Sequence, residues 1–101
     1  MREWNITGTE LTELLGPVVY VLSRNDVIIY VGMSRYGVSR ALSSGHHAIG
    51  DEIRSTDSLR FIFCPTGDSA ELLEAKLILQ YRPSLNKMTD GLLRKIKRGA
   101  Q

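Results

Sequence analysis

The sequence has little of what marks secreted or membrane-spanning proteins. Cys64 is the only cysteine, which excludes an intrachain disulfide framework and favours a reducing compartment. No apolar run approaches the roughly 20 residues that span a bilayer, and the N-terminal segment lacks the apolar region of a signal peptide. We therefore expect a cytoplasmic protein with no membrane partner.

Strong charge of one sign is also missing. The formal net charge of +2 is too small to indicate a nucleic-acid partner by itself. Basic residues gather around Arg35, Arg40 and His46 and again in a C-terminal tail over residues 89–101. Because such a run is more often a solvated face than a binding surface, this distribution is only weak support for nucleic-acid binding.

A chain of 101 residues supports one hydrophobic core and is too short for two. We expect a single domain over residues 1–101 with a core of about residues 16–86. A helix at 8–15 should precede this core, and a basic helix or tail at 89–101 should follow it.

Local patterns predict both helices and strands. Thr7 and Glu10 form a capping box that opens the N-terminal helix. Two β-branched and aromatic runs, 18–22 and 27–31, flank the turn residues 23–26 and predict a hairpin.

A third strand is predicted over residues 59–64, and the helix that follows opens with an acidic capping box of Asp68 and Glu71. Two short helices are expected between the hairpin and this strand, at 38–44 and 47–53. The order of elements predicts an α+β fold with a small three-stranded, mainly antiparallel sheet flanked by helices.

The loop length of the hairpin decides where its two tyrosines lie. A three-residue loop over 24–26 places Tyr20 directly opposite Tyr30, on the same face of the sheet. A two-residue loop would place them on opposite faces, because a slip of one residue exchanges the faces. We favour the longer loop, since Asn25 or Asp26 can adopt the left-handed conformation that it needs.

Glu74 is an acid on what should be the apolar face of a helix. Residues three and four positions apart share a helix face, so Glu74 lies beside Ala70, Leu77 and Ile78. Burying a carboxylate is costly unless it is paired or holds a metal. An isolated acid of this kind is an ion-pair partner or a strained surface acid about half the time, so this residue alone does not decide between structure and function.

Five side chains occur in order at compatible spacings: Tyr20 in Val18-Val19-Tyr20, Tyr30 in Tyr30-Val31-Gly32, Arg40 on the next helix, Glu74, and Asn86 after Pro83. Each short motif is weak alone. Together they resemble the GIY-YIG nuclease family over about residues 16–86, most strongly over 74–86. The sequence departs from the family pattern in its first triplet, Val-Val-Tyr, and at Met33, where repair-type members have a lysine.

The resemblance implies a metal-dependent endonuclease that hydrolyses phosphodiester bonds in DNA with one Mg²⁺ or Mn²⁺ ion. Glu74 would be the metal ligand, with water and phosphate oxygens in the other positions. Arg40 would stabilise charge on the scissile phosphate. Tyr20 and Tyr30 would hold or deprotonate the attacking water, with either as the base, and Asn86 would brace the site by hydrogen bonding.

Four further residues are candidate substrate contacts. Gly32 would let the backbone approach the substrate closely. Ser34 and Arg35 follow the second strand, where a loop can touch phosphate. His46 would contact phosphate or donate a proton, although a role at a helix junction is the commoner reading.

Two other functions are compatible with the sequence. Met33 and the altered first triplet favour a nucleic-acid-binding module that cleaves weakly or not at all. The chain would otherwise be the nuclease subunit of a larger complex. No specificity domain is recognisable, so DNA structure, a homodimer or a partner protein would have to supply selectivity.

Overall fold

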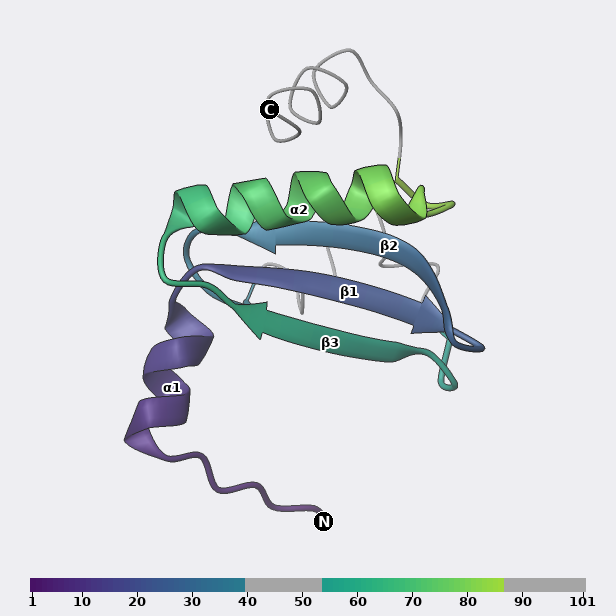
Figure 1. Cartoon of the computed structure of the whole chain (residues 1–101). Helices are drawn as coiled ribbons and strands as arrows, with labels where there is room; N and C mark the ends of the chain where they lie inside the picture. The colour runs from purple at the N-terminus through teal and green to yellow at the C-terminus, as the bar shows by residue number, and fades with distance from the viewer. Residues whose placement is uncertain (40–53, 87–101) are drawn as a thin grey trace.

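The structure is a computed structural model that describes residues 1–39 and 54–86. In chain order these residues form α1 (Gly8–Leu15), β1 (Val18–Arg24), β2 (Val27–Ser34), β3 (Ser58–Phe63) and α2 (Gly67–Tyr81), as Figure 1 shows. The three strands form one sheet in the order β2-β1-β3, and both strand pairs are antiparallel. The expected α+β class with a three-stranded antiparallel sheet is confirmed.

Several predicted segments are not part of this description. The helices expected at 38–44 and 47–53 fall almost entirely outside the described residues, as does the basic tail at 89–101. The extent of the domain stays a prediction. Within 1–39 and 54–86, no helix combines the length and the apolarity needed to cross a bilayer.

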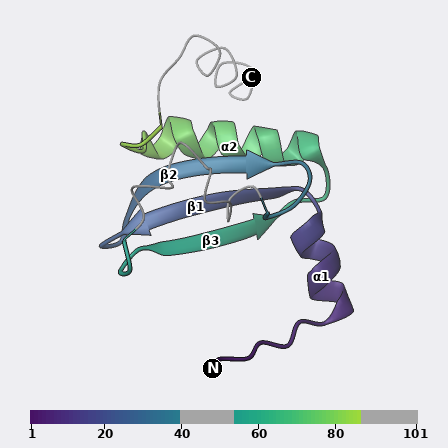
Figure 2. The ribbon, with the colours of Figure 1, turned by 180° about the vertical axis from the view of Figure 1, so that it is seen from behind.

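Helix α1 has the predicted bounds and the predicted capping box. The Glu10 N–H donates to Thr7 Oγ1 at 3.1 Å, and the Thr7 N–H donates back to Glu10 Oε1 at 3.4 Å. These two bonds satisfy N–H groups that the helix itself leaves unpaired. No residue of α1 is buried, and the helix lies on the opposite side of the sheet from α2 in both views (Figures 1 and 2).

The prediction of a three-residue hairpin loop is wrong. Arg24 pairs with Val27, so the loop holds only Asn25 and Asp26. Their φ angles are 52° and 64°, and a two-residue hairpin turn with both central residues left-handed matches the twist of the flanking strands. Asn and Asp tolerate this conformation better than other residues with a side chain.

The two tyrosines nevertheless share a face. The register shifts between Leu22 and Ser23, because Leu22 pairs with Tyr30 while Ser23 pairs with Ile28. Ile29 is thus an extra residue in β2, and a bulge of one residue restores the phase that the shorter loop would reverse. Tyr20 lies opposite Gly32 instead of opposite Tyr30.

Hydrophobic side chains cover both faces of the central strand. On one face, Val19 and Val21 of β1 and Val31 of β2 pack against Ala70 and Ile78 of α2. The other face carries a second cluster of Leu22 and Ile29, which Tyr30, Leu59 and Leu85 complete. Both views show α2 running alongside β2 (Figures 1 and 2), so the helix and the edge of the sheet that bear the predicted site are neighbours.

The capping box of α2 lies two residues earlier than expected. Thr66 is the N-cap and exchanges hydrogen bonds with Ser69, whose N–H donates to Thr66 Oγ1 at 3.0 Å. The predicted box of Asp68 and Glu71 is wrong. The two carboxylates bind the Arg35 guanidinium instead, each at 3.0 Å.

A second ion pair joins the end of β1 to the turn before β3. The Arg24 guanidinium donates Nε and Nη2 to the two carboxylate oxygens of Asp57, both at 2.9 Å. Asp57 also accepts the Arg54 N–H at 2.9 Å, and its side chain is only 1% exposed. The hydrogen bonds from Arg24, followed by that from Arg54, lower the pKa of Asp57 from 3.8 to about 2.

This pKa predicts an acid-sensitive contribution to stability. Between about pH 4 and pH 2 the unfolded chain protonates Asp57 while the folded chain does not, so the stabilisation falls as the pH falls. Asp57→Asn should remove that part of the pH dependence. Urea unfolding midpoints measured from pH 5 to pH 2.5 test this, with Asp26→Asn, in the exposed hairpin turn, as the control. An acid slope in Asp57→Asn equal to that of the parent would contradict the assignment.

Candidate active site

Tyr20 and Tyr30 form a stacked pair on one face of the hairpin. Their ring centroids are 6.2 Å apart and the ring planes are inclined by 27°. Tyr20 on the central strand is only 2% exposed, whereas Tyr30 on the edge of the described sheet is half-buried. Stacked phenols at this distance are within the range of favourable aromatic contact, so each ring fixes the orientation of the other.

Gly32 provides the space for the Tyr20 ring. A Cβ built on Gly32 would lie 2.7 Å from the Tyr20 hydroxyl oxygen and would also overlap the hydroxyl-bearing end of the ring. The ring therefore crosses from β1 over β2, and its hydroxyl lies on the backbone of β2. The requirement for glycine at this position comes from the tyrosine, which sequence reasoning did not anticipate.

Asn86 pairs with the outer edge of β2. The Val31 N–H donates to Asn86 Oδ1, and Asn86 Nδ2 donates to the Val31 carbonyl, both at 2.9 Å. The amide side chain thus satisfies both backbone groups of Val31, as a neighbouring strand would. The preceding Leu85 N–H donates to the Ile29 carbonyl at 2.8 Å. These bonds act on the strand segment that joins Tyr30 to Gly32, and a role for Asn86 in bracing an active site stays a prediction.

Glu74 lies on the buried face of α2. The buried residues of this helix are Ala70, Glu74, Ala75 and Ile78, and Glu74 is 8% exposed. The prediction that this acid shares the apolar face is confirmed. Because α2 packs against β2 and β1, the carboxylate is on the side of the helix that faces the sheet.

The donor set suits a hard cation with few protein ligands. Among residues 1–39 and 54–86, no three His, Cys, Asp or Glu side chains gather in a way that could hold a metal. A metal held at Glu74 would thus have at most two such ligands among these residues. Mg²⁺ accepts this arrangement because it keeps several waters and takes phosphate oxygens, whereas structural zinc needs four protein ligands.

Ser34 and Arg35 both have partners within the protein. Ser34 is 7% exposed, and its Oγ accepts the Tyr36 N–H at 3.1 Å. Arg35 pairs with the carboxylates of Asp68 and Glu71, which raise its pKa further, Asp68 most strongly. A substrate role for either residue stays a prediction, and these contacts give each a structural one. Arg40 and His46 lie outside the described residues.

No family model matches the chain, and no curated protein does. Solved structures of the GIY-YIG N-terminal endonuclease domain of UvrC from Thermotoga maritima do match. The domain bound to magnesium is 27% identical with a TM-score of 0.60, over 81% of this chain and all of the other. Two structures of tyrosine-to-phenylalanine point mutants of that domain, bound to their catalytic divalent cation, have TM-scores of 0.59. The chain is a GIY-YIG nuclease-like protein.

One departure of this GIY-YIG-like chain has a clear structural consequence. Met33, where repair-type members have a lysine, is half-buried and packs against the core cluster beneath α2. Met33 therefore contributes an apolar contact to the core, where a lysine would place a positive charge.

Gly32→Ala tests the placement of Tyr20. The added methyl group overlaps the ring, and overpacking of this kind costs about 1–3 kcal/mol. We expect a lower urea midpoint and a change in the near-ultraviolet circular dichroism of the tyrosine pair. The matched control is Gly8→Ala, since a Cβ on Gly8 meets nothing within 4 Å. Equal stability of Gly32→Ala and the parent would refute the arrangement.

Proposed function

We propose that this GIY-YIG-like protein is a divalent-metal-dependent endonuclease that hydrolyses phosphodiester bonds in DNA. The observation that carries the proposal is the buried Glu74 on α2, which packs against the two strands of the hairpin that carries the stacked tyrosine pair. The matched UvrC domain with this fold binds a catalytic magnesium ion. Fold and buried acid together favour catalysis over a purely structural role.

In this proposal Glu74 holds one Mg²⁺ or Mn²⁺ ion through its carboxylate. The bound ion would stabilise charge that develops on the phosphate and on the leaving oxygen. The burial of Glu74, which is 8% exposed, supports this role, because the attraction between a carboxylate and a cation is stronger where water is largely excluded. The apolar neighbours Ala70 and Ile78 also hold the helix in place against the sheet.

The tyrosine hydroxyls orient or deprotonate the attacking water. A phenol with the ordinary pKa of about 10 is a weak base at neutral pH unless a neighbouring charge lowers that value. We assign the stabilisation of phosphate charge to Arg40, whose guanidinium is always protonated. Asn86 acts indirectly, because it fixes the backbone between Tyr30 and Gly32 through Val31.

A second function is favoured by the packing of Met33. A GIY-YIG scaffold that lacks a cation at this position would bind nucleic acid and cleave it weakly or not at all. The same module could serve as one subunit of a larger complex. Cleavage assays separate these functions from the leading proposal.

Glu74→Gln should abolish cleavage. The amide keeps the size of the side chain but removes the negative charge, and loss of several kcal/mol of metal-assisted stabilisation corresponds to at least about a 100-fold lower rate. The assay is nicking of supercoiled plasmid and cleavage of branched oligonucleotides in Mg²⁺ or Mn²⁺. Binding of Mn²⁺, followed by electron paramagnetic resonance, should weaken in parallel.

Glu71→Gln is the matched control, one turn earlier on the same helix. Glu71 contacts Arg35, and Asp68 still pairs with Arg35 in that variant. It should therefore keep both cleavage and Mn²⁺ binding. Cleavage by Glu74→Gln at the parental rate would exclude the metal role, and Mn²⁺ binding without any cleavage by the parent would favour the non-cleaving module.

The variants Tyr20→Phe and Tyr30→Phe should identify the tyrosine that activates water. Loss of the acting hydroxyl should lower the single-turnover rate by about 10²- to 10⁴-fold and remove the rise of the rate with pH. The other variant should change the rate much less. Both should keep Mn²⁺ binding, as the cation-bound UvrC point mutants did. Parental rates in both variants would exclude a phenol as the base.

A further inference from the structure

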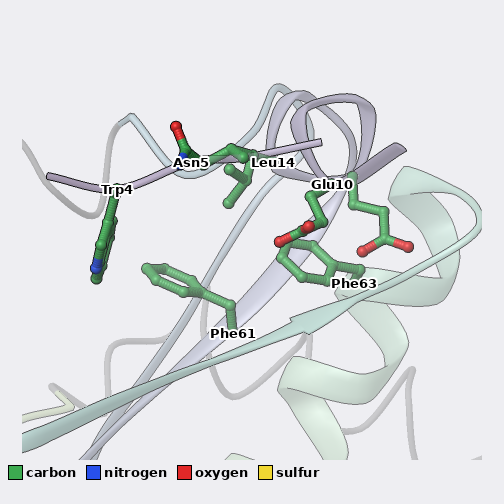
Figure 3. A pocket seen from close by; sticks show the side chains of 8 residues that line it. Trp4, Asn5, Glu10, Leu14, Phe61 and Phe63 are labelled. Carbon is green, nitrogen blue, oxygen red and sulfur yellow. The ribbon is translucent and has the colours of Figure 1, made fainter. Parts of the chain in front are cut away.

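A pocket lies between the N-terminal segment and β3, on the β3 side of the central strand. Its volume is about 420 Å³, which is within the range of small-ligand and side-chain sites. Apolar walls come from Trp4, Leu14, Phe61 and Phe63. Figure 3 shows the indole and the two phenyl rings at this pocket, with the segments that carry Trp4 and Leu14 lying across from β3.

The charged groups of this pocket are acidic. Glu10 and Glu13 of α1 line it, and none of the described residues that line it is a Lys, Arg or His. Glu10 is held by the capping box with Thr7, whereas Glu13 is exposed and takes part in no ion pair within the described structure. The lining of the pocket thus combines aromatic rings with two carboxylates.

The aromatic walls are accessible. Trp4 is 75% exposed and Phe63 is 39% exposed. The chain's own Arg2 already lies over the Trp4 ring, with its guanidinium carbon 5.2 Å from the ring centroid. A guanidinium over an indole is a favourable cation–π contact, so this ring accepts a cationic side chain on one of its faces.

We propose that this pocket is a docking site for a cationic, apolar peptide segment of a partner protein. The carboxylates of Glu10 and Glu13 would pair with Arg or Lys side chains, and the rings of Trp4, Phe61 and Phe63 would contact an aliphatic side chain. This combination of aromatic surface and opposite charge is typical of protein interfaces, where Trp and Arg dominate binding energy.

Charge argues against nucleic acid as the occupant. Aromatic rings can stack on bases, but a single strand carries one negative charge per phosphate, and two carboxylates at the pocket would repel it. The position of the pocket agrees with this. Phe61 is opposite Tyr20 across β1 and β3, while the Tyr20 hydroxyl lies over Gly32 of β2, on the other side of the central strand. Peptide and DNA would therefore approach different edges of the described sheet.

Trp4 is the only tryptophan of the chain, so its fluorescence reports directly on the pocket. The probe is a blocked hexapeptide in which arginine alternates with leucine, titrated into the full chain at low salt. Two control peptides replace all arginines by glutamate or all leucines by serine. We expect a saturable shift in emission with the first peptide and at least about tenfold weaker binding of either control, because each control removes one of the two complementary contacts.

Glu13→Gln should weaken the peptide about two- to fivefold at low salt, the size expected of one exposed ion pair. Asp26→Asn removes the same charge in the hairpin turn and should leave the affinity unchanged. Phe63→Ala should weaken the peptide as well, with circular dichroism confirming the fold. Equal affinities of Glu13→Gln and the parent, or no saturable binding, would overturn the proposal. The proposal would also be overturned if oligo(dT) bound at Trp4 and Glu13→Gln made that binding stronger.

Discussion

The site depends on the passage of the Tyr20 ring over Gly32. Tyr20 belongs to the central strand, so its side chain reaches the outer strand only across a residue without a Cβ. The extra residue Ile29 adds a second requirement, because it brings Tyr30 to the same face as Tyr20. Glycine makes room for the first ring, and the bulge positions the second, so the stacked pair needs both.

Strand β2 is joined to α2 at both ends of that helix. Arg35, just after β2, binds Asp68 and Glu71 in the first two turns of α2. At the other end, two residues that follow the helix form hydrogen bonds with the edge of β2, Leu85 through its backbone N–H and Asn86 through its side-chain amide. Exposed ion pairs contribute little to stability, but attachment at both ends restricts how α2 can shift along the strand. A functional group on a rigid element is held more closely than one on a loop, and Glu74 lies between the two attachments.

The sequence alone was sufficient to predict features that depend on only a few neighbouring residues. The capping box at Thr7 and the position of Glu74 on a buried helix face follow from local periodicity. The shared face of the tyrosines was predicted from a three-residue loop, whereas the structure reaches it through a two-residue loop and a bulge. The hairpin loop was predicted wrongly because Asn25 and Asp26 suit both loop lengths, and a bulge has no local sequence signal. The pairing of Arg35 with acids 33 and 36 residues away depends on tertiary structure, so no local pattern could reveal it.

Electrostatics separate the two proposed surfaces of this small protein. The carboxylates of Asp68 and Glu71 already pair with Arg35 at the start of α2, so in the proposed mechanism phosphate binding would rely on other cations of the chain and on a metal at Glu74. Across the sheet, Glu10 and Glu13 make the pocket beside β3 unfavourable for a polyanion. A DNA strand drawn to the β2 side would therefore be kept away from the β3 side. That side would stay available to a cationic peptide, and the two ligands could bind at the same time.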